Sequence, residues 1–390
     1  MKLSEVVDFQ NGYAFKSKHF VKNGKYKVIK IKELKDGEVN FFSDSATIDC
    51  SEDEYENYKV NSGDVLFALT GDPVNKPNPL SWVGRVSVYN HEEVAFLNQR
   101  VCKLIPSKHI NPLYVYYFFR DYSNFYNLAS LAKGSASQAN ISTKDIGNVE
   151  FELPPLAIQN KIVNILGKID KKIRTNRKIN NNLEQQAQAI YQQMFIDNAS
   201  LEWTEGTLSD IADITMGQSP SGSSYNEDGN GTIFFQGRAE FSFRFPTVRL
   251  FTTEPKRMAC ANDTLMSVRA PVGDLNVAYT DCCIGRGLAA IHSKDNHQSF
   301  VLYTMFSLKK QLNVFNGEGT VFGSINRNSL NEMPILIPSS EKLDEFEALT
   351  SPMNAAIRNN YDEICRLEQL RDSLLPKLMS GELDVSDIDL

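Results

Sequence analysis

Apolar residues in the first 155 positions occur in short runs, such as residues 26–34 and 65–69, separated by Gly, Asn and Pro. This pattern is typical of strands joined by turns and loops. Between Leu113 and Asn127 the apolar residues are mostly aromatic and follow helical spacing. Such a stripe favours a helix packed into a core, with a base-stacking platform as the alternative. The segment therefore predicts a mixed α+β domain.

A long amphipathic helix is predicted after the proline pair Pro154-Pro155. Apolar residues from Ile162 to Met194 step by threes and fours, and a second such series runs from Phe346 to Leu378. This spacing is that of a coiled-coil seam, in which a polar Asn can fix the register. The candidate residues for pairing of the two helices are Ile169, Ile173, Asn176, Leu183, Met353, Ile357, Asn360 and Leu367. The alternative is that each helix lies on its own domain.

The charges of the two helices differ in sign. The first carries six basic residues between Lys168 and Lys178 against the single Asp170, whereas the second is acidic around 341–347 and 362–368. Opposite charges favour pairing of the helices and select its direction more than they add stability. If the two helices are related by a pseudo-twofold axis, they run antiparallel.

The whole pattern of domain and helix occurs twice. The residues LSEVVD at 3–8 recur as LSDIAD at 208–213, each copy then reaches a glycine, Gly12 or Gly217, and from Ile141 onward the copies keep one constant shift of 184 positions. A repeat of this length indicates a duplicated domain, because solenoid repeats have only about 20 to 50 residues. We therefore predict two α+β domains related by pseudo-twofold symmetry and separated by an antiparallel coiled coil of two long helices. The predicted segments are 1–155 (first domain), 156–198 (first helix), 199–339 (second domain), 340–380 (second helix) and 381–390 (C-terminal tail).

Composition narrows the class of protein without defining its function. The chain has 390 residues, a formal net charge of −7, six cysteines without CxxC spacing and five histidines without the spacing of zinc ligands. These features predict free thiols and no metal site. The absence of a signal-like segment and of an apolar run of about 18 residues predicts a cytoplasmic protein with no membrane partner.

Two sequence motifs carry a resemblance to a known family. They are LLPKLMSGEL at 374–383 and LPPLAIQ at 153–159, the latter leading into the first helix. With the twofold order of domain and helix, they make the chain similar over its whole length to the specificity subunit of Type I restriction-modification systems. The resemblance implies that each domain is a target recognition domain for one half of a bipartite site in double-stranded DNA, and that the helices form a spacer that sets the gap.

The resemblance also implies the partners. Two methyltransferase (modification) subunits, which methylate adenine, and motor nuclease (restriction) subunits would carry the catalysis. S-adenosylmethionine, ATP and Mg are expected on those partners, and no cofactor on this chain. Catalytic motifs are indeed lacking in the sequence: there is no Asn-Pro-Pro-Tyr-like motif, and no catalytic Asp motif follows the glycine-rich residues 317–323. The alternatives are a coiled-coil protein scaffold, or a specificity subunit of a modification-only or other defence system without a cognate nuclease.

The candidate DNA contacts lie in polar loops, because loops can reach base edges while a framework stays fixed. Basic residues are lysines in the first domain, clustered between Lys16 and Lys35, and arginines in the second, among them Arg244 and Arg249. Arg suits guanine, whereas Gln and Asn suit adenine, so the two domains imply an asymmetric target. The candidates are Lys16, Lys18, Lys22, Thr70, Asn75, Lys76, Ser135, Ser137, Gln138, Asn140, Gln218, Ser219, Ser221, Gln236, Arg238, Arg269, Thr320 and Ser324.

Residues that recur in both copies are predicted to belong to the framework. The pairs are Gly12 with Gly217, Asp64 with Asp263, and Arg100 with Arg286. Side chains shared by two domains of different specificity are poor candidates for sequence readout. For each polar loop residue, an ordinary turn remains the alternative to a DNA contact.

Overall fold

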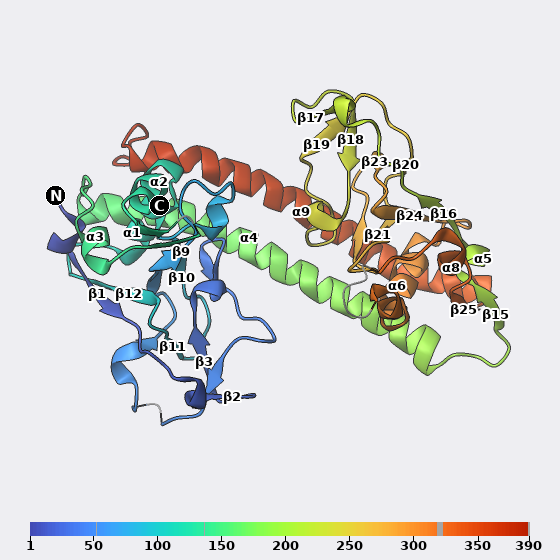
Figure 1. Ribbon diagram of the computed structural model, residues 1–390, viewed down its shortest axis with the longest axis horizontal. Coiled ribbons are helices and arrows are strands. Elements are labelled where there is room, and N and C mark those ends of the chain that lie inside the picture. Colours follow the sequence, from blue (N-terminus) through green and yellow to red (C-terminus); the bar gives the residue numbers. More distant parts are fainter. Residues whose placement is uncertain (52, 136, 318–322, 389–390) are drawn as a thin grey trace. The chain divides into compact units, whose positions relative to one another are not determined.

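The computed structural model describes residues 1–51, 53–135, 137–317 and 323–388, and the chain divides into two compact units (Figure 1). Unit 1 comprises Met1–Arg174 with Cys365–Leu390, and unit 2 comprises Thr175–Ile364. Each unit combines helices with sheets and includes a segment of both long helices, α4 (Leu156–Tyr191) and α9 (Ser340–Met379). The mixed α+β class and the presence of two long helices are thus confirmed.

The described residues of unit 1 form three sheets. The first has the strand order β1 (Val7–Asn11), β12 (Val101–Pro106), β8 (Val65–Ala68), β10 (Val86–Val88), β5 (Glu38–Val39) and β4 (Leu34–Lys35). The second has the order β2 (Phe20–Val21), β6 (Thr47–Ile48), β3 (Tyr26–Ile29), β11 (Ala95–Leu97) and β7 (Lys59–Val60). The third has the order β13 (Lys133–Ser135), β14 (Gln138–Asn140) and β9 (Thr70–Gly71). Short 3-10 turns are η1 (Leu3–Glu5), η2 (Ser17–His19), η3 (Ile31–Glu33), η4 (Glu56–Tyr58) and η5 (Pro79–Ser81).

The aromatic segment of unit 1 forms two helices, α1 (Pro112–Arg120) and α2 (Tyr122–Ser130), and not the single helix that its spacing predicts. The break lies at Asp121, which has extended backbone angles and accepts a hydrogen bond from the Asn124 amide at 3.1 Å as the N-cap of α2. Tyr114 and Phe119 are almost fully buried in the core, which confirms the core interpretation of the stripe. A third short helix, α3 (Thr143–Gly147), precedes α4.

Unit 2 repeats this plan. One sheet has the order β16 (Ala212–Met216), β24 (Leu288–Ser293), β21 (Thr264–Ser267) and β22 (Leu275–Val277). A second has the order β17 (Tyr225–Asn226), β19 (Leu250–Thr252), β18 (Thr232–Phe235), β23 (Cys282–Ile284) and β20 (Met258–Ala259), and β15 (Thr204–Thr207) pairs with β25 (Pro334–Ile337). The remaining elements are a π-helical turn Gln192–Asp197, α5 (Leu208–Ile211), η7 (Gly222–Ser224), η8 (Arg238–Glu240), α6 (Gln298–Ser307), α7 (Lys309–Leu312), η9 (Asn313–Asn316) and α8 (Arg327–Asn331).

Two of the three recurring pairs form the same framework contacts in both units. A Cβ atom on Gly12 would lie 2.1 Å from the Asn98 carbonyl oxygen, and one on Gly217 would lie 2.2 Å from the Gly285 carbonyl oxygen. Asp64 and Asp263 each accept a hydrogen bond at 2.8 Å from the amide three residues earlier. Glycine is therefore required by a close backbone approach, and aspartate closes the turn before a central strand.

The third pair, Arg100 with Arg286, is not equivalent, and its assignment to the framework is wrong. The Leu69 amide donates to the Arg100 carbonyl and the Val268 amide donates to the Gly287 carbonyl, both at 2.9 Å. These bonds extend the β8–β12 and β21–β24 ladders by one residue. Arg100 therefore corresponds to Gly287, because backbone register and not the identity of a side chain defines equivalence. Arg286 corresponds to Gln99.

In each unit the segments of α4 and α9 pack against each other and run antiparallel. In unit 1 the Arg371 guanidinium pairs with Asp170 at 3.2 Å, and the earlier Lys161 reaches the later Ser386 carbonyl at 2.6 Å. In unit 2 Asn176 donates to Glu363 at 2.8 Å. Asn180 joins both Ile357 and Asn360. Of the predicted seam residues, Ile173, Asn176 and Ile357 are buried, and Ile169, Leu183, Met353, Asn360 and Leu367 are half-buried.

The residues after α9 belong to the core of unit 1. Val385 is only 1% exposed and lies in the hydrophobic cluster that contains Ile162 and Leu378. The described part of the predicted tail thus packs on the protein. Nowhere in the described ranges is a helix both long and apolar enough to span a membrane.

Candidate nucleic-acid interface

In unit 1, three residues from three chain segments form a row just beyond the end of strand β8. Thr70 pairs with Asn140 in the β9–β14 ladder. On its other side, the hydrogen bond from Leu69 to Arg100 extends the β8–β12 ladder, so that the next residues, Thr70 and Gln99, lie opposite each other. We call Gln99, Thr70 and Asn140 the cross-strand row of unit 1.

The three side chains of this row have different surroundings. Thr70 is 3% exposed, and its hydroxyl donates to the Asn140 side-chain oxygen at 2.7 Å. Gln99 and Asn140 are exposed. Thr70 therefore orients the Asn140 amide, whose NH₂ group points away from that bond, and the accessible groups of the row are two carboxamides.

Unit 2 has a row at the same backbone positions with different side chains. Arg269 forms an antiparallel bridge with Ser324. The Val268 amide donates to the Gly287 carbonyl, which places Arg286 opposite Arg269. Arg286, Arg269 and Ser324 are all exposed and form the cross-strand row of unit 2. Sequence reasoning missed Gln99 and Arg286, because only the register of the ladders reveals them.

A groove of about 280 Å³ lies along the row of unit 2. Its lining residues are Gln236, Gly237, Arg238, Ser267, Arg269, Ala270, Arg286 and Gly287. The structure therefore brings together the candidates Gln236, Arg238 and Arg269. Arg238 is held by Asp274, with 2.6 Å between the guanidinium and the carboxylate. The hydroxyl of the candidate Ser219 accepts a hydrogen bond from the Arg286 backbone amide at 3.3 Å. The backbone amide of Gln218 donates to the Ile284 carbonyl.

Two other arginines of unit 2 belong to the structure of the domain. Arg244 is buried, contacts Tyr303 and Asn354, and forms an ion pair with Glu184 at 3.6 Å. Burial raises the pKa of the Glu184 carboxyl, and Arg244 opposes this effect. Arg249 pairs with Glu240 at 3.0 Å. The Arg244 guanidinium is thus buried among its partners, and the Arg249 guanidinium is held by two carboxylates, those of Glu240 and Glu227.

The remaining candidates of unit 1 lie on two loops and a hairpin. Ser135 and Gln138 flank the turn of the β13–β14 hairpin, which leads directly to Asn140, and the Ser135 and Ser137 hydroxyl oxygens are 3.2 Å apart. Asn75 and Lys76 are exposed on a loop that the Trp82 indole fixes by donating to the Lys76 carbonyl at 2.8 Å. The hairpin is thus joined to the cross-strand row of unit 1.

The lysine cluster of unit 1 is partly engaged by its own domain. Lys32 pairs with Asp44 at 2.8 Å, and the Lys30 ammonium lies 4.1 Å from the centre of the Phe20 ring. Lys16, Lys18 and Lys22 are exposed and have no ion pair among the described residues. The basic surface available to a polyanion is therefore smaller than the sequence indicates and includes these three lysines.

The remaining candidates of unit 2 are Ser221, which does not line the groove, and Thr320. Ser221 is exposed, and its hydroxyl lies 2.8 Å from that of Ser223. Thr320 lies outside the described residues.

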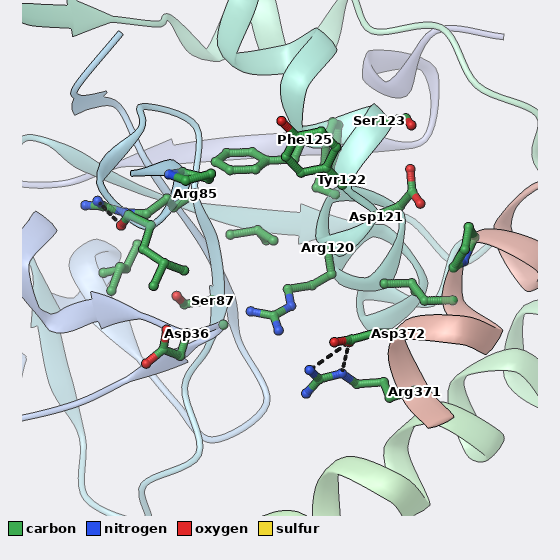
Figure 2. A pocket seen from close by; sticks show the side chains of 18 residues that line it. Asp36, Arg85, Ser87, Arg120, Asp121, Tyr122, Ser123, Phe125, Arg371 and Asp372 are labelled. Atoms are coloured by element: carbon green, nitrogen blue, oxygen red, sulfur yellow. Dashed lines mark hydrogen bonds and ion pairs between the residues drawn. The ribbon is translucent and has the colours of Figure 1, made fainter. Parts of the chain in front are cut away.

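A cavity with a volume of about 570 Å³ lies in unit 1 (Figure 2). Its walls come from the β4–β5 turn at Asp36, from Ser87 of β10, from α1 and α2, and from Arg371 of α9. Figure 2 shows the Arg120 side chain extending into the cavity from α1. None of the candidate DNA contacts lines it. Because base edges are reached by side chains that protrude into a groove of the duplex, the exposed rows and not this cavity form the candidate interface.

Other chemistry is not supported by the described part of the chain. No disulfide joins any of the six cysteines, and no group of three or more His, Cys, Asp or Glu side chains is placed to hold a metal ion among the described residues. Burial raises the pKa of the Cys102 and Cys282 thiols to about 12, so that neither is an activated nucleophile.

Known proteins similar to this chain are specificity subunits. A Methanocaldococcus jannaschii protein whose name describes the MjaX specificity subunit of a type I restriction enzyme is 28% identical over 379 residues, covering 92% of this chain and 88% of its own length. The MjaIX specificity subunit of the same organism is 24% identical, covering 75% and 73% of the two chains. The crystal structure of a type I restriction-modification system S subunit from M. genitalium has a TM-score of 0.61 at 15% identity, covering 99% of this chain and 96% of that one, and it shares the fold.

The family described as the type I restriction modification DNA specificity domain matches residues 1–185 and 200–359. Each match includes one cross-strand row. The prediction of a recognition subunit without a catalytic site of its own is confirmed, and the chain belongs to the type I restriction-modification DNA specificity family.

Proposed function

We propose that unit 1 and unit 2 each recognise one half of an asymmetric bipartite site in double-stranded DNA. One observation carries this proposal: the two cross-strand rows occupy the same backbone positions but present different chemistry. Unit 1 offers the carboxamides of Gln99 and Asn140, and unit 2 offers the guanidinium groups of Arg286 and Arg269. Two domains that recognise different half-sites need the same backbone framework with different side chains at the contact positions.

We further propose that α4 and α9 form an antiparallel coiled coil that sets the gap between the half-sites. Support comes from the antiparallel contacts inside each unit, from Asp170–Arg371 in unit 1 to Asn176–Glu363 in unit 2. The opposite charges of the two helices and their buried asparagines favour this pairing in one register.

Catalysis belongs to partner subunits in this proposal. Two methyltransferase subunits would methylate adenine with S-adenosylmethionine, and motor nuclease subunits would use ATP and Mg to cleave unmethylated DNA. The chain itself would hold none of these cofactors. Its task is to position the partners on a defined DNA sequence.

The test is to sequence methylated adenines in a host with the partner subunits, in the presence and absence of this gene. We expect one bipartite, asymmetric motif to be methylated only when the gene is present. An unchanged methylation pattern, with the methyltransferase shown to be active, would refute DNA recognition. Complex assembly in that case would favour a coiled-coil protein scaffold.

A further inference from the structure

We propose that Arg269 and Arg286 are specificity-determining residues, each of which binds one guanine in the half-site recognised by unit 2. This inference rests on the proposed function. It adds to that function the identity of two side chains that contact bases and of the bases that they select. The same positions in unit 1, Thr70 and Gln99, carry no charge and would select differently.

The first argument is the electrostatic cost of this pair in the free protein. Arg269 and Arg286 lie opposite each other at the end of the β21–β24 ladder. Like charges directly opposite on antiparallel strands are destabilising, and arginine does not lose its proton to relieve the repulsion. No carboxylate lines the groove that both side chains share, and neither side chain has an ion pair among the described residues. Two unpaired cations at this position are expected where a ligand supplies the acceptors.

The second argument is the rigidity of the backbone that presents them. The chain is fixed on both sides of Arg269 by hydrogen bonds at 2.9 Å, from Val268 to Gly287 and from Ala270 to Gly323. The Arg286 amide is held by the Ser219 hydroxyl. The glycines beside it pack closely on the neighbouring strand, because a Cβ atom on Gly285 would lie 2.8 Å from the Gln236 carbonyl oxygen. A fixed backbone reduces the entropy lost when the side chains bind.

The third argument is the contrast with Arg238 in the same groove. Its guanidinium is already bound to Asp274, which Lys309 also approaches at 3.8 Å. The donors of Arg238 are therefore partly used, and its charge is compensated. Arg249 serves as the control, because it has the same exposed side chain but lies outside the groove and pairs with Glu227 and Glu240.

Guanine is the base that fits these groups. Its O6 and N7 atoms form two adjacent acceptors in the major groove, which match the two parallel donors of a guanidinium. Lysine keeps the charge but offers no such fork. Substitution of Arg by Lys therefore removes the bidentate contact with guanine but keeps the attraction to phosphate.

The experiment introduces Arg269→Lys, Arg286→Lys and the control Arg249→Lys into the full chain, with the partner subunits, and sequences the methylated sites. We expect each of the first two variants to relax selection at one G·C pair, roughly 5- to 150-fold, with both pairs in the same half-site. The control is expected to leave the motif unchanged. Binding of matched and mismatched duplexes, measured against salt concentration, checks that the overall affinity is retained.

Several outcomes would overturn the inference. They are a wild-type motif without G·C pairs in the affected half, two variants that act on different halves, or a motif unchanged in both. The proposed function survives any of these as long as methylation still depends on the gene. If the methylation pattern does not respond to the gene at all, the proposed function itself fails.

Discussion

Side chains at equivalent positions of the two units separate into those that build the domain and those that face a ligand. Gly12 and Gly217 belong to the first kind, because the backbone of another strand passes where a Cβ atom would stand. Gln99 and Arg286 belong to the second, because they share a position in the ladder but no chemistry. A residue that recurs in both units is therefore meaningful only once the hydrogen-bond register is known.

The framework glycines lead to a prediction about stability. We expect Gly217→Ala to lower the free energy of unfolding by about 1–3 kcal/mol or more, since the new methyl group would overlap the Gly285 carbonyl, which accepts a hydrogen bond from the Leu288 amide at 2.9 Å. Gly222→Ala is the matched control, because nothing lies within 4 Å of its added Cβ atom. Chemical denaturation of the full chain measures both, and a Gly217→Ala variant as stable as the control would contradict the assignment.

At the level of elements, each unit ties its aromatic helix to a long helix through a buried tyrosine. In unit 1 the Tyr117 hydroxyl of α1 donates to Asp170 of α4 at 2.7 Å. In unit 2 the Tyr303 hydroxyl of α6 donates to Asn354 of α9 at 3.1 Å. Asp170 and Asn354 are separated by the same shift of 184 positions that relates the two copies. Both copies thus keep a hydrogen bond that attaches the domain to a long helix. The acceptor is a carboxylate in unit 1 and a neutral amide in unit 2.

We expect Tyr117→Phe to destabilise unit 1 by about 1–3 kcal/mol, because the variant leaves a buried carboxylate with one donor fewer. Tyr303→Phe removes a bond to the neutral Asn354 amide and also an acceptor of the buried Arg244 guanidinium, and the expected loss is likewise about 1–3 kcal/mol. Tyr122→Phe is the control, since Tyr122 is exposed. Thermal unfolding of the three variants at neutral pH tests the order of these effects. An equal loss for Tyr117→Phe and Tyr122→Phe would contradict it.

These tyrosines also predict a dependence on pH. Burial, followed by the negative charge of Asp170, raises the pKa of Tyr117 above its ordinary value, and burial raises that of Tyr303. A raised pKa in the folded protein means that the contribution to stability is complete below the unfolded value of about 10 and declines above it. In Tyr117→Phe the fall of stability between about pH 10 and 12 should be smaller than in the unsubstituted protein.

At the scale of the whole molecule, the proposed coiled coil links the distance between half-sites to the length of two helices. Each helix contributes a segment to both units, with the division after Arg174 and after Ile364. Helix residues 171–177 and 363–369 lie at this division, between the contacts Asp170–Arg371 and Asn180–Asn360, and they include the pair Asn176–Glu363. A change in both helices at this point would keep the flanking pairs in register.

Deletion of 171–177 together with 363–369 should therefore shorten the gap in the methylated motif. One heptad corresponds to about 10.5 Å of helix, or roughly three base pairs of DNA. We expect a gap shorter by about three base pairs, or loss of methylation if the rotation of the half-sites cannot be accommodated. Deletion of 171–177 alone breaks the register and is expected to abolish methylation. A gap of unchanged length in the double deletion would refute the spacer.

The sequence by itself determined the duplication, the mixed domains, the starts of both long helices and most of the polar loops, because these depend on local periodicity, on turn residues and on repeated motifs. The tertiary structure alone decided three matters: the break of the aromatic helix at Asp121, the packing of Val385 in unit 1, and the membership of Gln99 and Arg286 in the cross-strand rows. The packing of Val385 and the two rows depend on which distant segment lies beside which, whereas the break at Asp121 depends on a capping hydrogen bond that helical spacing does not reveal. A shift of the strand register by one residue moves each side chain to the other face of the sheet, and so from the framework to the binding surface or the reverse. The local pattern of residue types does not reveal such a shift.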